Sequence, residues 1–205
     1  MTAPVTRRRR GGAIARERML EEAMRAIAEH GLAELTMSGL AERLGTSGGH
    51  ILYYFGTKDR LLLEALRWSE DRLTGERRAL LSRRTTVARR LDAFVELYLP
   101  QGPRDSRWML WIELWARAAG NSELTGAQEE FDRAWQEDLE HLLRKGVRQG
   151  RFALAEEEVP EAADTLLALL DGLSTRVVLG LRGATREGAV RTARGAARNA
   201  VRPRA

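Results

Sequence analysis

The sequence predicts an all-α protein, in which a small N-terminal unit of three helices precedes a larger helical bundle. Apolar residues recur at the three- and four-residue spacing of an amphipathic helix almost throughout the 205 residues. No segment alternates apolar and polar residues for long enough to predict a β-sheet. Glycines, prolines and residues that cap helices fall at the ends of the periodic segments and divide the chain into separate helices.

The first predicted helix carries an apolar stripe between Leu20 and Ala28. Gly31 follows the stripe, and glycine often ends a helix in the left-handed conformation. Before the stripe, residues 7–10 are four arginines in a segment without apolar periodicity. We therefore expect residues 1–11 to form a disordered basic arm.

Two short helices follow, separated by a tight turn. Thr36 is a good N-cap for the first of them, and Gly45 ends it. Thr46 or Ser47 then starts the second short helix, which runs through about Tyr54. Two short helices joined by a turn with glycine have the layout of a helix-turn-helix.

A longer helical region begins at Thr57, which is a good N-cap for a leucine-rich helix with Asp59 in its first turn. Prolines and a glycine at positions 100, 103, 150 and 160 punctuate the helices that follow. These helices are expected at residues 87–99, 105–119, 123–149, 160–181 and, as an open case, 185–200.

Composition and charge exclude several classes of protein. The chain has no cysteine, which excludes disulfides, thiolate–zinc sites and cysteine nucleophiles. The apolar stretch 166–181 contains Asp171 and Arg176, which argues against a membrane span, and no signal peptide is recognisable, so we expect a cytoplasmic protein. The net charge is +3 over residues 1–60, −4 over 61–181 and +6 over 182–205. Any binding of a polyanion should therefore be confined to part of the surface.

Residues 36–60, TMSGLAERLGTSGGHILYYFGTKDR, carry the most specific pattern. Gly48 and Gly49 each cost roughly 1 kcal/mol relative to alanine inside a helix. A short helix that contains both can bring its backbone close to the edge of a DNA groove. The alternative is that tertiary packing simply tolerates two glycines in a first turn.

Aromatic and basic residues in the same segment suggest contacts with phosphate. Ile51 and Phe55 share one helix face and can pack inward, which leaves a neighbouring tyrosine hydroxyl free to donate to a phosphate. Lys58 opposes the helix dipole in a first turn, a position that favours a lysine only when an anion binds nearby. An ordinary exposed lysine is the alternative.

This pattern, from Arg16 to Leu66, resembles the DNA-binding domain of the TetR family of transcriptional regulators. The matching residues are Ala26, Gly31, Thr36, Ala41, Leu44, Gly45, Ser47, Tyr53, Phe55, Lys58 and Leu61. The resemblance implies a helix-turn-helix domain at 12–56, a helical ligand-binding and dimerisation domain at 57–205, and a homodimer on a palindromic double-stranded DNA operator. It also implies a repressor that a small-molecule inducer releases.

By matching position, the resemblance assigns phosphate contacts to Thr36, Tyr53 and Lys58. It assigns contacts with bases to Thr46, Gly48, Gly49 and His50. Arg43 can share the base readout because glycines offer no side chain, and Ser47 and Tyr54 complete the predicted set. Leu52 departs from the family, where tyrosine is common, and cannot donate to a phosphate. The arginines at 7–10 either reach a minor groove or add only non-specific affinity.

Aromatic residues cluster in the second domain. Trp108, Trp111 and Trp115 share one helix face, and aromatic residues of neighbouring helices can join them: Phe94, Tyr98, Phe131 and Trp135. The cluster is either a hydrophobic core or an aromatic-walled cavity for an apolar or cationic ligand. This region is similar to the choline-sensing, BetI-type branch of the TetR family.

Asp171 lies within the apolar repeat of 160–181 and can bind a ligand amine, pair with Arg176 or face a partner subunit. We predict a ligand site formed by Phe94, Tyr98, Trp111, Trp115, Trp135 and Asp171. Helix 160–181, and as an open case 185–200, is the dimer surface that the resemblance implies. The C-terminal arginines are expected to be a solvated face.

Catalytic, metal and cofactor motifs are not recognisable, and we predict no catalytic residue, metal or cofactor. The three histidines lack metal-ligand spacing with carboxylates, and no GxSxG or phosphate-binding loop occurs. The alternative functions are a helical ligand-binding protein, or a carboxylate-based enzyme, without specific DNA binding. In the regulator, the long helix from Thr57 would transmit changes in the ligand domain to the DNA-reading helix.

Overall fold

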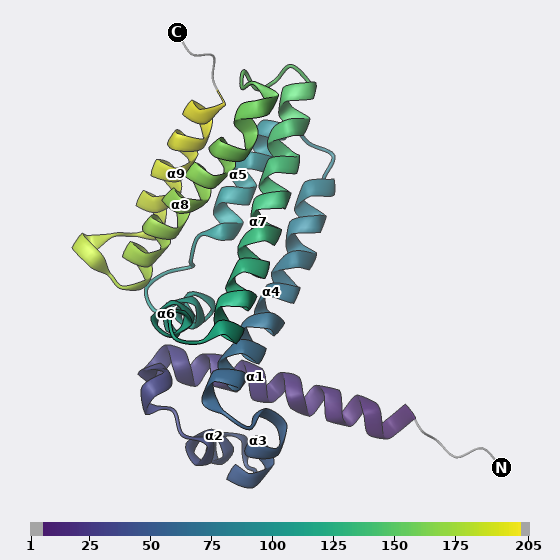
Figure 1. Cartoon of the computed structure of the whole chain (residues 1–205), viewed down its shortest axis with the longest axis vertical. Helices are drawn as coiled ribbons and strands as arrows, with labels where there is room; N and C mark the ends of the chain where they lie inside the picture. Colours follow the sequence, from purple (N-terminus) through teal and green to yellow (C-terminus); the bar gives the residue numbers. More distant parts are fainter. Residues whose placement is uncertain (1–5, 202–205) are drawn as a thin grey trace, which may run out of the picture.

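The structure is a computed structural model that describes residues 6–201, with side chains described from residue 16 onward. Figure 1 shows a lower unit that contains the first three helices, joined to an upright bundle. The α-helices of the described part are α1 Thr6–Glu34, α2 Met37–Leu44, α3 Gly48–Phe55, α4 Lys58–Ser82, α5 Val87–Tyr98, α6 Ser106–Ala118, α7 Ser122–Arg148, α8 Val159–Val178 and α9 Arg186–Ala200. Two short 3₁₀ turns flank α8, at Glu156–Glu158 and Leu181–Gly183. The predicted all-α fold is confirmed.

Local capping explains why α2, α3 and α4 begin where they do. The side chains of Thr36, Ser47 and Thr57 each accept a hydrogen bond from the backbone N–H three residues later, at 2.9, 3.2 and 3.2 Å. Ser47, rather than Thr46, is therefore the cap of α3. Gly45 ends α2 in the left-handed conformation, with φ 66° and ψ 37°, as predicted.

Two helix ends differ clearly from the sequence prediction, and one open case is resolved. Gly31 breaks α1 with φ 81° and ψ 161°, so its backbone is not left-handed helical, and one further helical turn follows it. Helix α8 ends at Val178 rather than 181, because Gly180 adopts a left-handed conformation that starts the 3₁₀ turn. Leu181, which the sequence places in a buried stripe, is consequently exposed. Helix α9 is present where 185–200 was an open case.

The predicted disordered arm at 1–11 remains untested. Residues 1–5 lie outside the described residues, and helix α1 includes 6–11 without described side chains. The expected role of the arginines at 7–10 therefore also lies outside the described side chains.

The lower unit is connected to the bundle by α4 and α6. Helix α4 leaves the lower unit and continues upward beside α7, while α6 lies end-on above α1 (Figure 1). Helix α1 packs against both α4 and α6. Buried residues form one continuous cluster through both units. The cluster includes Leu40, Ile51 and Phe55 in the lower unit and Leu110 and Leu143 in the bundle. Within the described residues, no helix is long and apolar enough to cross a membrane.

Candidate nucleic-acid interface and ligand cage

Helix α3 places its aromatic residues on two different sides. Ile51 and Phe55 are fully buried, as their spacing predicts, whereas 86% of Tyr53 is exposed. The Tyr53 hydroxyl is therefore free to donate to a phosphate. Tyr54 is half-buried and stacks on His50, with 5.1 Å between the ring centroids, so His50 presents its ring from a supported position.

The predicted polar contacts on α2 and the turn are close to the surface. Thr36 and Ser47 are exposed, and each also caps its helix. Thr46 is half-buried in the turn, and its N–H donates to the carbonyl of Ala41 at 2.9 Å. Gly48 packs against Ser38 of α2. These positions belong to one compact helix-turn-helix.

Arg43 is the predicted DNA contact that the structure supports least. Its guanidinium binds Glu22 at 2.5 Å and Glu29 at 2.6 Å, both on α1. These carboxylates raise the pKa of Arg43, and the hydrogen bond from Arg43 lowers the pKa of Glu29. Arg43 therefore connects α2 to α1 and has few donors left for a base edge.

Lys58 is also engaged within the protein. Its Nζ donates to the carbonyls of Leu32 at 3.3 Å and Ala33 at 2.9 Å, in the last turn of α1. An ammonium has three donors, so one donor remains for a phosphate. This arrangement explains a cation in the first turn of α4 without any bound anion.

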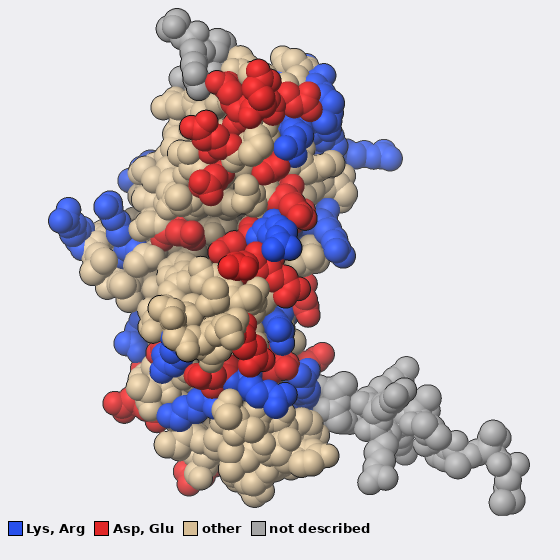
Figure 2. Space-filling model, viewed as in Figure 1, with Lys and Arg blue, Asp and Glu red and all other residues tan. Residues whose placement is uncertain are grey.

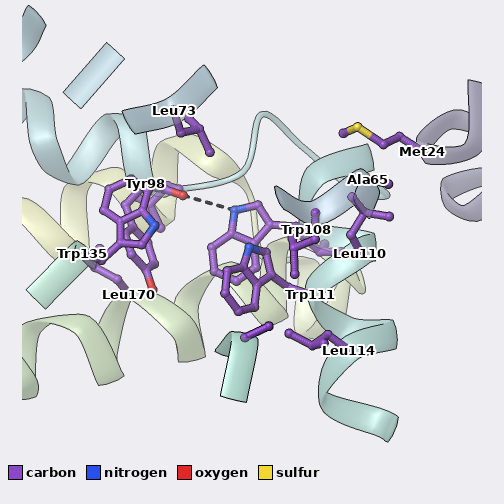
Figure 3. Packing of buried hydrophobic residues seen from close by; sticks show 14 of the residues in the cluster. Met24, Ala65, Leu73, Tyr98, Trp108, Leu110, Trp111, Leu114, Trp135 and Leu170 are labelled. Atoms are coloured by element: carbon purple, nitrogen blue, oxygen red, sulfur yellow. Dashed lines mark hydrogen bonds between the residues drawn. The ribbon is translucent and has the colours of Figure 1, made fainter. Parts of the chain in front are cut away.

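The aromatic cluster of the bundle encloses a very small cavity, of about 10 Å³, which is at most the space of one water molecule. Figure 3 shows Trp135 beside Tyr98, with Trp108 and Trp111 next to them. The lining residues come from α4 to α8 and are Glu70, Tyr98, Arg107, Trp108, Trp111, Trp115, Asp132, Trp135 and Asp171. We call this set the cage. In this structure the cage is packed as a core.

Glu70 holds two indole rings of the cage in position. Its carboxylate accepts hydrogen bonds from Nε1 of Trp111 at 3.2 Å and Nε1 of Trp135 at 2.9 Å. Arg77 lies 3.9 Å from the centre of the Trp135 ring and 3.7 Å from Glu70, and it donates to Asp138 at 2.7 Å. Glu70 is therefore fully occupied in orienting the tryptophans.

The two other carboxylates of the cage, Asp132 and Asp171, form no ion pair within the described part of the chain. Asp171 accepts a hydrogen bond from the Tyr98 hydroxyl at 2.7 Å, and burial raises the pKa of Asp171 to about 6. Burial also raises the pKa of Asp132, against a smaller opposing effect of its hydrogen bond with Gln128. A cation placed between these carboxylates would stabilise their charged forms.

Arg107 is the one cation among the lining residues, and its hydrogen bonds go to main-chain carbonyls. It donates to the carbonyls of Tyr98 at 2.5 Å and Leu97 at 3.3 Å, while burial lowers its pKa. Trp108 donates to the same Tyr98 carbonyl at 3.1 Å, the dashed line in Figure 3. Both side chains thus fix the chain between α5 and α6.

Most of the predicted ligand residues come together, with one exception. Tyr98, Trp111, Trp115, Trp135 and Asp171 all line the cage. Phe94 does not, because it is fully buried behind Trp135, with 5.4 Å between the ring centroids. The partner of Asp171 is Tyr98, whereas Arg176 is exposed.

Sequence reasoning missed four lining residues: Glu70, Arg107, Trp108 and Asp132. Glu70 had a detectable signal, because it continues the buried stripe of Leu63, Leu66 and Leu73 at helical spacing. A charged residue on a buried stripe needs a polar partner. Asp132 had no comparable signal, since its helix is rich in acidic residues.

The end of α1 is held by side chains from the bundle. Arg104 precedes α6 and donates to the carbonyls of Ala28 at 2.7 Å and of Glu29. Its own N–H donates to the carbonyl of Val178, at the end of α8, at 3.0 Å. Arg104 has a φ of 56°, which is unusual for a residue other than glycine and indicates a constrained link.

Helix α6 makes a second connection to the lower unit. Glu113 accepts a hydrogen bond at 2.8 Å from the N–H of Leu32, the first residue after the break at Gly31. Arg117 binds Glu113 at 2.6 Å and lies 3.6 Å from Asp59 of α4. Because Trp111 and Trp115 of α6 line the cage, this one helix touches both candidate sites.

Helices α8 and α9 form an outer surface with an open groove of about 270 Å³. Its apolar lining includes Leu154, Leu166 and Leu169. The arginines of α9 are not all a solvated face: Arg194 pairs with Glu96 of α5, and Arg198 binds Asp92 of α5 at 2.9 Å. The prediction also covers Arg202 and Arg204, but residues 202–205 lie outside the described residues.

Two family models match the chain, one for each unit. Residues 19–65 match the model for bacterial regulatory proteins of the tetR family. Residues 87–201 match the model for the C-terminal domain of BetI-type transcriptional repressors.

Curated relatives and solved structures agree with these matches. The regulator BetI of Escherichia coli is 30% identical over 81% of this chain and 83% of its own length. BetI 1 of Chromohalobacter salexigens is 28% identical over 83% of this chain and 82% of its own. A putative transcriptional regulator from Saccharomonospora viridis, solved in complex with choline, has a TM-score of 0.82 and 31% identity, and covers 89% of this chain and 95% of that one.

Proposed function

Because the chain belongs to the TetR family of DNA-binding transcriptional regulators and has a BetI-type C-terminal domain, we propose that it is a repressor that an organic cation releases from its operator. The observation that carries the proposed ligand class is the composition of the cage. Indole and phenol rings line the cage together with Asp171, whose charged form burial disfavours, and the more exposed Asp132 adds a second carboxylate. Aromatic faces and carboxylates together favour a quaternary ammonium group. The similar regulator with bound choline supports the same class.

Ligand entry must open the cage. A cavity of about 10 Å³ cannot contain a quaternary ammonium, so the rings have to separate when the ligand binds. Trp108, Trp111 and Trp115 belong to α6, and their displacement moves that helix. The ligand then favours the open form, and the free energy of opening is part of its affinity.

Movement of α6 would change the position of α3, the proposed DNA-reading helix. Glu113 binds the end of α1, Arg117 lies beside Asp59 of α4, and both residues are on α6. This route adds to the long helix α4, which the sequence favoured as the connection. Reciprocity requires that operator DNA weaken ligand binding by the same factor by which the ligand weakens DNA binding.

Operator recognition would use a homodimer formed through α8 and α9. The half-exposed apolar residues Leu169 and Leu173 of α8 and the groove beside α9 support this surface. Two reading helices then meet half-sites one helical turn apart, about 34–36 Å. A change of a few ångströms in that separation would prevent simultaneous binding.

The alternatives are a helical ligand-binding protein and a carboxylate-based enzyme without specific DNA binding. Neither accounts for an exposed tyrosine on the second helix of a helix-turn-helix. The curated relatives are named as transcriptional regulators. Selection of bound DNA from a random pool distinguishes the regulator from both alternatives. The regulator should select a palindrome, whereas neither alternative should select one.

Choline and its uncharged isostere, 3,3-dimethylbutan-1-ol, test the proposed ligand class. Choline should change tryptophan fluorescence and release the selected operator over the same concentration range, because the indoles report opening of the cage. The isostere has the same shape without the charge and should bind at least tenfold more weakly.

Trp68→Phe is the matched control for the fluorescence signal. Trp68 lies on α4 outside the cage, where Arg72 covers its ring at 5.0 Å. The variant should keep the choline-dependent change, whereas Trp115→Phe should reduce it. Equal binding of choline and the isostere would contradict a cation site, and fluorescence changes without operator release would contradict the coupling.

A further inference from the structure

Helix α3 presents an uncharged, apolar strip to the outside. Gly49, Leu52, Tyr53 and Gly56 follow one another at the spacing of a single helix face, and all four are exposed. Leu52 is 48% exposed, and α3 contains no Asp, Glu, Lys or Arg. On the face drawn in Figure 2, the lower tip, where α2 and α3 lie, is mostly free of charged side chains. Leu52 and Tyr53 are adjacent, and a contiguous exposed apolar patch is more informative about binding than a single exposed leucine.

The two adjacent glycines of α3 have different explanations. A Cβ atom at Gly48 would lie 3.2 Å from the Ser38 hydroxyl and 3.6 Å from the Ser38 Cα, so packing between α2 and α3 favours glycine there. A Cβ atom at Gly49 would meet no atom nearer than the Ser47 hydroxyl at 4.0 Å. Gly49 also lacks a left-handed backbone. Folding therefore gives no reason for a residue that weakens a helix.

Two of the three nearby cations offer little readout of base edges, and the third, Arg60, lies beside Gly56 at the end of the strip. Arg43 is paired with Glu22 and Glu29, and Lys58 with carbonyls of α1. His50 is the polar side chain of α3 best placed for a hydrogen bond to a base. The Tyr53 hydroxyl is the predicted phosphate contact, so Leu52 is the side chain of the strip that can recognise a base only by apolar contact. The apolar group on base edges in the major groove is the thymine methyl.

We propose that Leu52 selects a thymine by packing on its methyl group, and that Gly49 keeps α3 close enough to the base edges for this contact. The proposal rests on the function proposed above, since it requires α3 in the major groove. Gly49 precedes Leu52 by three residues on the same face, so any side chain at 49 would stand between the helix and the DNA. Leu52 is then a specificity-determining residue in place of a phosphate contact.

Deoxyuridine substitution in the selected operator tests this contact directly, because it removes the thymine methyl and nothing else. Replacing each thymine in turn should lower the affinity of the wild-type protein about fourfold at one position of each half-site, the effect of losing burial of one methyl group. Leu52→Ala should bind the thymine and deoxyuridine operators equally. Its thermal unfolding should match the wild type, since Leu52 is on the surface.

The outcomes separate this proposal from the proposed function. Failure to select any specific DNA sequence would overturn both. Selection of a palindrome without a deoxyuridine effect at any position would overturn the role of Leu52 alone. The same conclusion follows if Leu52→Ala weakens binding to all sequences equally, because the side chain would then touch only the DNA backbone.

Gly49→Ala and Gly75→Ala form a matched pair, because both glycines are exposed within a helix and neither has an atom nearer than 4.0 Å to an added Cβ. Gly49→Ala should raise the unfolding temperature, because alanine favours the helix, and should weaken operator binding at least tenfold. Gly75→Ala, in α4, should likewise raise the unfolding temperature but leave operator affinity within about threefold. Unchanged operator affinity in Gly49→Ala would overturn the close approach.

Discussion

The reading helix α3 and the cage reverse the usual distribution of residues in opposite ways. Helix α3 exposes Leu52 and Tyr53 to solvent and carries no charged side chain. The bundle buries the carboxylate of Glu70, which lines the cage, and the guanidinium of Arg77 beside it. Apolar groups usually lie inside and charged groups outside, so these two exceptions support the two proposed binding sites.

The comparison also teaches where stability resides. An exposed side chain of α3 contributes little to folding, whereas a buried ion pair leaves an uncompensated charge when one partner is removed. Truncation of the exposed side chains of α3, Leu52 and Tyr53, should therefore change binding with little change in stability. Substitutions in the cage should change both.

The largest effect is expected for Glu70→Ala. Loss of this carboxylate leaves the N–H groups of Trp111 and Trp135 without a buried acceptor and Arg77 with Asp138 as its remaining carboxylate partner, so the free energy of unfolding should fall by about 3–5 kcal/mol. Tyr53→Ala should change it by less than about 0.5 kcal/mol. Urea unfolding, followed by circular dichroism, measures both.

Glu70→Gln serves as the control, because its amide oxygen retains an acceptor and should restore part of the lost stability. Equal unfolding free energies for Glu70→Ala and Tyr53→Ala would show that the contrast between the two regions is wrong.

A smaller effect, which depends on pH, is expected for Asp171→Asn. Burial raises the pKa of Asp171 to about 6 from its ordinary value of 3.8, so the folded protein holds this proton more tightly than the unfolded chain. Rising pH therefore lowers the contribution of Asp171 to stability between about pH 4 and pH 6. Above that range, the full loss of stability from the buried charge is present. The variant should become more stable than the wild type over this interval, by about 1–3 kcal/mol at pH 7.

Unfolding free energies at pH 4 and pH 7 give the required difference between variant and wild type. Asp164→Asn, at an exposed position of the same helix, should show no such pH dependence. A difference that does not grow with pH would mean that Asp171 is not charged at a cost in the folded protein. Choline affinity of the wild type should likewise decline as pH falls below about 6, because the cation favours the ionised carboxylate.

The smallest effect is expected for Lys58→Ala, which sharpens the description of the reading region. If the remaining donor of Lys58 contacts a phosphate, the variant should lower the dependence of log affinity on log salt concentration by about one unit. Binding should weaken by the same factor for all DNA sequences, because phosphate contacts carry no sequence information. Titrations of operator and unrelated DNA at several salt concentrations measure this.

Lys145→Ala is a matched control, since Lys145 lies in the last turn of α7, at the opposite end of the molecule (Figure 1). An unchanged salt dependence in Lys58→Ala would show that Lys58 serves only to bind the carbonyls of Leu32 and Ala33.

The two regions also differ in how far the sequence could predict them. The lower unit depends on contacts between close neighbours, such as the cap from Ser47 to the N–H of His50. Such contacts can be predicted from a short stretch of sequence, which is why the bounds of α2, α3 and the start of α4 were predicted almost to the residue. The match to the TetR family rests on this same local pattern.

The cage depends on contacts between distant residues, which no short window contains. Glu70 reaches Trp135 across 65 residues, and Tyr98 reaches Asp171 across 73. Periodicity identified the aromatic face of α6 but could not say that Phe94 lies behind Trp135. The same reason explains Lys58, whose partners lie about 25 residues away on α1.

The joint between the two units is built from main-chain groups of α1. Arg104 binds the carbonyls of Ala28 and Glu29, Glu113 binds the N–H of Leu32, and Lys58 binds the carbonyls of Leu32 and Ala33. Every amino acid except proline supplies these main-chain groups, so α1 contributes a backbone path to the joint, whereas Arg104, Glu113 and Lys58 contribute side chains. The sequence of the lower unit can therefore diverge while that of the bundle is retained. Hybrid regulators that exchange the first three helices between related proteins should still release DNA when the ligand binds, wherever a glycine breaks the first helix at the same place.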